Sequence, residues 1–256
     1  MDSLLTLSLD GYRSVELLLR LTVALSGMTA LLLALTARSI PDGRRILLTL
    51  PAVALGGAAW FEHGVWLSWK EAFELAGSSY AVTGHLLGSE DRIIAWSLAV
   101  PPVLLAFGMA GMPWGKAGGF LLERLAATVA ALALLAPFSR LAALTLLAYA
   151  FYLLLRQMPS LSPAPLATET RVALGAVGFS ILIMLLGSWH LLPLGKEAET
   201  RLVRGEVFRT LGDLIGLCLP AVALLVGLLR LPAEAANQAA NPLAEPPLPS
   251  PPKERK

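Results

Sequence analysis

The sequence predicts an all-α integral membrane protein, a bundle of seven transmembrane helices followed by a disordered tail. Of the 256 residues, 56% are hydrophobic and only 15% are charged, against about 25% charged in a typical soluble domain. Apolar runs recur along the chain, each close to the roughly 20 residues that a helix needs to cross the hydrocarbon of a bilayer. After residue 231 the composition changes and proline becomes frequent. These three observations predict a transmembrane domain over residues 1–231 and a separate tail over 232–256.

The seven apolar runs follow one another with short polar interruptions. They span residues 14–37, 46–67, 92–112, 119–137, 140–156, 172–193 and 207–230. The fourth and fifth runs are separated only by Pro137, Phe138 and Ser139, which predicts a tight helical hairpin. The single cysteine, Cys218, lies inside the last run, so a disulfide framework is excluded.

The tail, residues 232–256, is predicted to be extended and disordered. It contains many prolines, and it ends in the charged residues Lys253, Glu254, Arg255 and Lys256. Proline has no backbone N–H for a helix, and the segment offers little apolar surface to bury. An odd number of spans puts this tail on the opposite side of the membrane from the N-terminus.

Loop charges predict the orientation of the bundle. The first loop carries Arg38, Arg44 and Arg45, and the second loop is rich in Asp and Glu. Positive loops stay in the cytoplasm, so we expect a multi-pass protein of the cell membrane with its N-terminus outside and its C-terminus inside. The loop over 194–209, which holds several Lys and Arg residues, disagrees with this orientation. The net charge of +2 gives no reason to expect a nucleic-acid partner.

Two short motifs resemble those of the microbial (type I) rhodopsins. The third run carries Arg92, Trp96 and Pro101 at the spacing of the family pattern Arg-x-x-Asp-Trp-x-x-Thr-x-Pro. The last run carries Asp213 where the family has Leu-x-Asp-x-x-x-Lys. The resemblance covers residues 10–230, and it implies a seven-helix fold around a retinal pocket.

The departures from the family pattern are equally informative. The resemblance places the retinal-binding lysine at Leu217, and it places the proton acceptor, its threonine partner and the proton donor at Ala95, Ala99 and Ala106. None of these side chains can form a Schiff base or exchange a proton. The resemblance therefore implies that the proton path is lost and that no retinal is bound covalently. What remains of the pocket is Trp96, Pro101 and Leu217.

A charge count connects these losses. The family pocket balances a protonated Schiff base and an arginine against two aspartates. This chain lacks both the lysine and one aspartate, which leaves Arg92 opposite Asp213. An uncompensated charge inside a bilayer is costly. We therefore expect Arg92 and Asp213 to form a structural ion pair.

Two functions are compatible with this sequence. The first is a non-pumping rhodopsin-like protein, a structural or regulatory subunit that forms homo- or hetero-oligomers with membrane proteins. The alternative is a photosensor or carrier that holds retinal or a carotenoid noncovalently beside Trp96.

A transporter or membrane enzyme is the least supported function. It would use Arg20, Glu62, His63 or Asp213. Arg20 and Glu62 can meet at similar depth, and either a salt bridge facing the bundle or a side chain that reaches the membrane surface explains them better than an ion path. No arrangement of these residues points to a reaction, so we expect no enzymatic activity. The three histidines are not spaced for a metal site.

Overall fold

The computed structural model describes residues 6–40, 42–85, 87, 89–111, 166–188 and 198–230, with isolated residues between 124 and 156. The tail and most of the predicted helices 119–137 and 140–156 lie outside this part of the chain. The described ranges contain the elements β1 (Thr6–Ser8), α1 (Leu9–Ser39), α2 (Asp42–Ala72), β2 (Phe73–Ala76), β3 (Ser79–Val82), α3 (Ser89–Gly111), α6 (Ala167–Ser188) and α7 (Ala198–Arg230).

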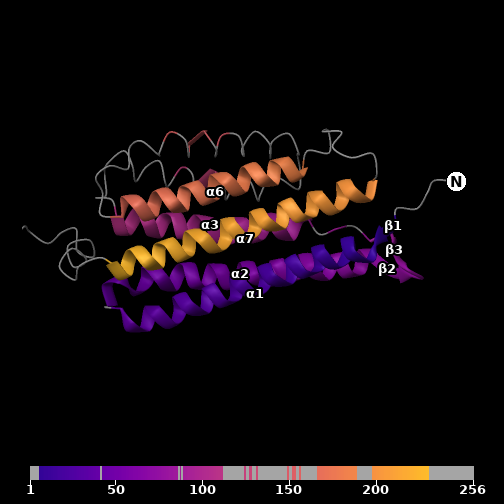
Figure 1. The fold of residues 1–256 in the computed structure, drawn as a ribbon. Helices are drawn as coiled ribbons and strands as arrows, with labels where there is room; N and C mark the ends of the chain where they lie inside the picture. Colours follow the sequence, from indigo (N-terminus) through magenta and orange to yellow (C-terminus); the bar gives the residue numbers. More distant parts are fainter. Residues whose placement is uncertain are drawn as a thin grey trace, which may run out of the picture.

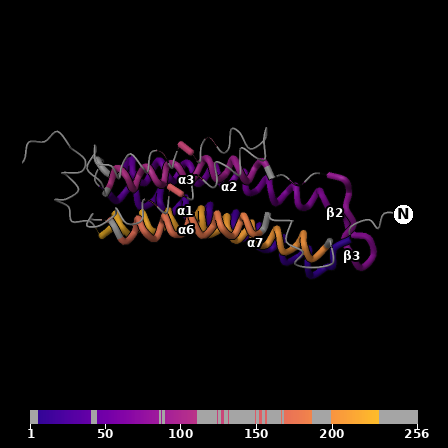
Figure 2. The backbone as a smooth tube through the Cα atoms, turned by 90° about the horizontal axis from the view of Figure 1, so that it is seen from above, coloured from indigo at the N-terminus to yellow at the C-terminus, as the bar shows by residue number. Residues whose placement is uncertain are grey.

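The helices run side by side along one long axis (Figure 1). In this view α7 crosses the middle of the bundle, with α1 and α2 below it and α3 and α6 above it. The strands β1, β2 and β3 lie together at one end of the bundle in Figure 1, and Figure 2 shows β2 and β3 at the same end, which we call the sheet end. Within the described ranges, α7 packs against α1, α3 and α6. It therefore occupies a central position from which its side chains reach three neighbours.

The pattern of α1 shows why these segments form a bundle in a membrane. Val15, Leu19 and Leu33 lie at helical spacing on a buried face. Large apolar side chains on the opposite face are exposed, among them Leu17 at 59% and Met28 at 65%. A helix that is apolar all round needs lipid on the side that no neighbour covers. All five described helices are long and apolar enough to cross a membrane, which confirms the predicted all-helical membrane bundle.

The sheet end carries a small sheet that the sequence analysis placed in a loop. β3 pairs antiparallel with both β1 and β2, and Gly77 allows the tight turn between β2 and β3 at a φ of 67°. The rings of Tyr12 on α1, Trp69 on α2 and Phe73 on β2 pack together and join the sheet to the helices. Strands of three or four residues are too short to give a clear alternation of polar and apolar positions. The sheet was therefore not predicted, although it does not alter the helical class.

The start of α7 also differs from the prediction. The apolar run predicted a last helix from residue 207 and a loop over 194–209, whereas α7 begins at Ala198. Its first turns carry charged residues. Such residues are costly inside the hydrocarbon, but a helix can contain them where it projects beyond the membrane. The Glu199 carboxylate accepts a hydrogen bond of 2.6 Å from the Ser8 backbone N–H, which ties this end of α7 to β1. Glu206 consequently lies on a helix and is buried.

Candidate functional site

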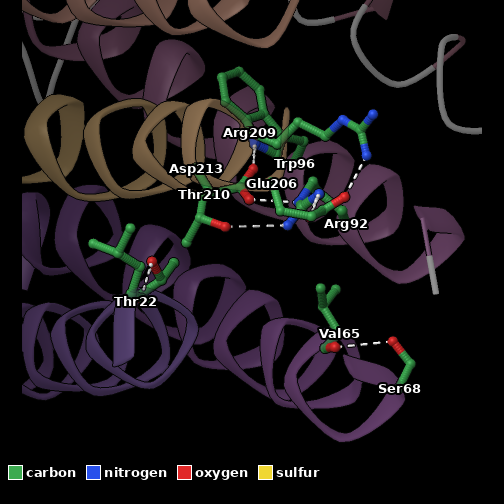
Figure 3. A network of polar contacts seen from close by, with 10 residues as sticks. Thr22, Val65, Ser68, Arg92, Trp96, Glu206, Arg209, Thr210 and Asp213 are labelled. Carbon is green, nitrogen blue, oxygen red and sulfur yellow. Dashed lines mark hydrogen bonds and ion pairs between the residues drawn. The ribbon is translucent and has the colours of Figure 1, made fainter. Parts of the chain in front are cut away.

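A polar cluster lies between α3 and α7 inside the bundle (Figure 3). We call it the Arg92 cluster, and it consists of Arg92, Trp96, Glu206, Arg209, Thr210 and Asp213. All of them except Arg209 are buried. Buried charges in proteins are almost always paired, and those within membrane spans usually face the bundle interior.

Arg92 is the centre of this cluster. Its Nε atom lies 2.6 Å from Asp213 Oδ2, and one terminal nitrogen donates a 3.1 Å hydrogen bond to Glu206 Oε2. The other terminal nitrogen lies 3.5 Å from the Thr210 hydroxyl, at the limit of a hydrogen bond. One guanidinium group from α3 therefore spans two turns of α7. This geometry uses the several donors that a planar guanidinium group offers.

Both acidic partners have a second donor. Trp96 Nε1 donates a 2.8 Å hydrogen bond to Asp213 Oδ1, and Arg209 forms an ion pair with Glu206 on the same helix. Two guanidinium groups and two carboxylates together carry no net charge. The Arg92 cluster is thus electrically balanced, as a site held inside a bilayer should be.

The sequence analysis expected the pairing of Arg92 with Asp213 but missed Glu206. Residues 206, 210, 213 and 217 are spaced to share one face of α7. Continuing the apolar helix toward its N-terminus at this spacing would have identified Glu206. The charged residues between 194 and 209 concealed it, because they suggested a loop.

The other predicted site residues are all buried. Ala95, Ala99 and Ala106 line one face of α3, and α3 continues as a helix through Pro101. Leu217 is 1% exposed, one turn beyond Asp213 on α7. These positions contribute no ionisable group to the interior beside the Arg92 cluster.

Trp96 also contacts the backbone of α7. A Cβ atom added at Gly216 would overlap the Trp96 ring and would lie 3.0 Å from Cβ of Ser180 on α6. The missing side chain of Gly216 therefore leaves room for the indole between α3, α6 and α7. This contact and the Trp96–Asp213 hydrogen bond hold the indole against α7.

Of the two alternatives for Arg20 and Glu62, the salt bridge between them is not formed. Arg20 forms an ion pair of 2.6 Å with Glu16, four residues earlier on α1, and its guanidinium group lies over the Trp66 ring. The charge of Arg20 is thus paired within α1, and Arg20 contacts α2 through the Trp66 ring. Glu62 is fully buried instead. Within the described part of the chain, no three metal-ligating side chains gather into a site.

Comparison with solved structures identifies the fold. The chain is similar to thermophilic rhodopsin, with a TM-score of 0.69 and 21% identity over 94% of this chain and 100% of that one. It is similar to xanthorhodopsin, a light-driven ion pump with a dual chromophore, with a TM-score of 0.64 and 19% identity over 94% and 99%. It is also similar to a blue light-absorbing proteorhodopsin from Med12, with a TM-score of 0.55 and 14% identity over 85% and 98%.

These similarities show an all-helical membrane bundle with the microbial rhodopsin fold. No protein-family model matches the chain, and no curated protein matches it in sequence. At identities of 14–21% the likeness concerns the fold alone. The chemistry of this chain must therefore be argued from its own residues.

Proposed function

We propose that this chain is a non-pumping membrane protein of the rhodopsin fold, without covalent retinal, that acts as a structural or regulatory subunit of a membrane assembly. The observation that carries the proposal is Leu217, buried one turn beyond Asp213 on α7. By the motif resemblance, this is the position of the lysine that binds retinal. A leucine side chain has no amine and cannot form a Schiff base.

No other lysine offers a replacement. The chain has five lysines, Lys70, Lys116, Lys196, Lys253 and Lys256, and all lie outside the seven apolar runs. Lys70 is in the last turn of α2, at the sheet end. An amine at the end of a helix is far from the Trp96 and Asp213 side chains in the interior.

The interior of α3 also argues against proton pumping. Ala95, Ala99 and Ala106 have methyl side chains that neither accept nor donate a proton. Without an ionisable Schiff base, light has no proton to displace along this face. The Arg92 cluster is instead arranged as a fixed link between α3 and α7, which suits a scaffold.

Retinal reconstitution tests the absence of a covalent pigment. The wild type, purified with added retinal, should yield no retinal adduct after reduction with borohydride. Leu217→Lys should yield an adduct at residue 217, because it places an amine one turn from Asp213. Leu224→Lys, at another fully buried position of α7, is the matched control and should yield none. A covalent adduct in the wild type would refute the proposal.

The subunit role is tested by native mass spectrometry of the protein extracted gently from its own membranes. A complex of fixed stoichiometry, homo-oligomeric or with one defined membrane protein, is the expected result. A monomer at every detergent concentration would contradict the role of a subunit.

An absorption spectrum of the same preparation tests the alternative function. Trp96 is held against α7 and offers one wall for a planar pigment. A visible or near-ultraviolet band that is lost on solvent extraction would favour a photosensor or carrier of retinal or a carotenoid. A spectrum without such a band would favour the subunit function.

A further inference from the structure

Glu62 on α2 is the least satisfied charged side chain in the described part of the protein. Its residue is 0% exposed, and neither carboxylate oxygen has a hydrogen-bond partner among the described residues. Isolated ionised carboxylates are among the most costly groups to bury. Some compensating species is therefore needed at this position.

The charges around Glu62 cannot supply it. The side chain interacts electrostatically with Arg92 and Asp91 on α3 and with Asp213 and Glu206 on α7, and it also influences Cys218. Arg92 is the one cation in this set, and Asp213 and Glu206 already engage it. No charged group of α1 belongs to the set, since Arg20 is paired with Glu16. His63 on α2 faces Trp60 and Trp66.

Adding Glu62 to the Arg92 cluster breaks its charge balance. Two guanidinium groups would then face three carboxylates, which leaves one uncompensated negative charge in the interior. Asp91 on α3 is only half-buried, so solvent screens its charge and it does not enter this count. The missing charge is a single positive one.

The Arg92–Asp213 contact leaves hydrogen-bonding capacity toward the same interior. Arg92 Nε and Asp213 Oδ2 are 2.6 Å apart, but their geometry is not that of a hydrogen bond, and each lacks another partner among the described residues. The lone pair of Asp213 Oδ2 that Arg92 does not use remains an acceptor, and a protonated Glu62 carboxyl group needs an acceptor for its O–H and a donor for its carbonyl oxygen. Water supplies both functions and is the usual occupant of a buried polar gap.

We propose that Glu62 is a proton-binding site: its carboxyl group holds one exchangeable proton and is linked through water to the Arg92–Asp213 pair. A neutral carboxylic acid restores the charge balance, and its O–H group becomes a donor. A proton fits better than a metal ion, because the described residues gather no three metal-ligating side chains and Arg92 repels a second cation. This site goes beyond the proposed subunit function and does not require a pigment.

The site would make the bundle sensitive to pH. The folded protein keeps a proton on Glu62 that the unfolded chain releases at neutral pH. Because the folded state then binds more protons, stability is complete at low pH and falls as the pH rises through the range in which Glu62 ionises. Ionisation would place an unpaired charge between α2 and the α3–α7 pair and weaken their packing.

Infrared spectroscopy of the full-length protein tests the assignment. The wild type at neutral pH should show the carbonyl stretch of a protonated carboxylic acid, which shifts in heavy water. Glu62→Gln should lose this band and lose the one-proton slope of thermal stability against pH. Glu90→Gln, an exposed carboxyl in the first turn of α3, is the matched control and should retain both.

Two results would overturn the proposal: no protonated-carboxyl band in the wild type, or a band that persists in Glu62→Gln. If Glu62→Gln does not fold, isotopic labelling of glutamate carboxyl carbons in the wild type replaces it. A band that shifts with labelled glutamate and survives in Glu206→Gln supports Glu62. A band that shifts only with labelled aspartate assigns the proton to Asp213 and refutes the proposal.

Discussion

Arg92 shows how one residue can link two helices inside a membrane. Its guanidinium group contacts Asp213 and Glu206, two turns apart on α7, and both contacts are shielded from solvent. A buried ion pair adds little net stability compared with apolar residues of the same size. Removing one partner is costly nevertheless, because the other charge remains buried. The role of the cluster is therefore best measured by single substitutions.

Asp213→Asn should destabilise the protein by about 3 kcal/mol, within the range for breaking a buried ion pair. The substitution removes the charge that faces Arg92 Nε and leaves Glu206 as its only acidic partner in the cluster. Unfolding in mixed micelles measures the change. Glu16→Gln, which removes a partly exposed i,i+4 pair, should cost less than about 1 kcal/mol. Equal effects of the two substitutions would show that the Arg92 cluster does not hold the bundle.

At the scale of the elements, close approach of helices depends on small residues. Gly216 lets the Trp96 ring lie against α7, and a Cβ at Gly212 would lie 2.7 Å from the Met184 side chain on α6. Such positions increase van der Waals contact, which drives helix association where lipid already surrounds apolar surfaces. The close packing of α3, α6 and α7 therefore depends on Gly212 and Gly216, which carry no side chain.

Gly216→Ala should destabilise the protein by about 1–3 kcal/mol, because the new methyl group overlaps the Trp96 ring. Gly27→Ala on α1 is the matched control, since nothing lies within 4 Å of its added Cβ. In that helix alanine is preferred over glycine by up to about 1 kcal/mol. The thermal midpoints should move in opposite directions. A gain of stability in Gly216→Ala would contradict the observed packing.

A polar contact between Ser8 and Glu199 links the strand β1 to α7. Glu199→Ala removes the acceptor of the Ser8 N–H and should speed hydrogen exchange at residues 6–11 while the β2–β3 hairpin stays protected. Hydrogen-exchange mass spectrometry measures both segments. Glu74→Ala, an exposed position on β2, should leave residues 6–11 unchanged. Faster exchange across the whole bundle would mean that the contact stabilises more than β1.

At the scale of the whole molecule, charge and topology predict the same orientation. The start of α1, the sheet and the start of α7 lie at the sheet end, and the basic residues Arg38 and Arg45 lie toward the other end. The positive-inside rule places the basic end in the cytoplasm. The charged start of α7, which disagreed with this rule, carries Glu199 and Glu206 beside its arginines.

The orientation is tested by labelling cysteines in intact cells with a reagent that cannot cross membranes. In a Cys218→Ser background, Glu74→Cys at the sheet end should react, and Ser39→Cys at the other end should react only after permeabilisation. Both positions are exposed in the structure. The reverse pattern would place the N-terminus inside.

The sequence by itself determined the membrane-embedded helical class and the approximate position of each described helix, although α1, α2, α6 and α7 begin earlier than the apolar runs that predicted them. Hydropathy is a local property, and it decides where a chain can cross a bilayer. The two motifs also identified Arg92, Trp96 and Asp213, because helical spacing translates directly into a shared face. The absence of an amine at Leu217 needed no structure.

Only the tertiary structure decided which polar groups meet. It brought Glu206 to Arg92, engaged Arg20 within its own helix and left Glu62 buried without a partner among the described residues. These outcomes depend on the rotation and length of each helix, and particularly on the start of α7 at Ala198. Distances between helices are set by side-chain packing across the bundle, which no local pattern in the sequence records.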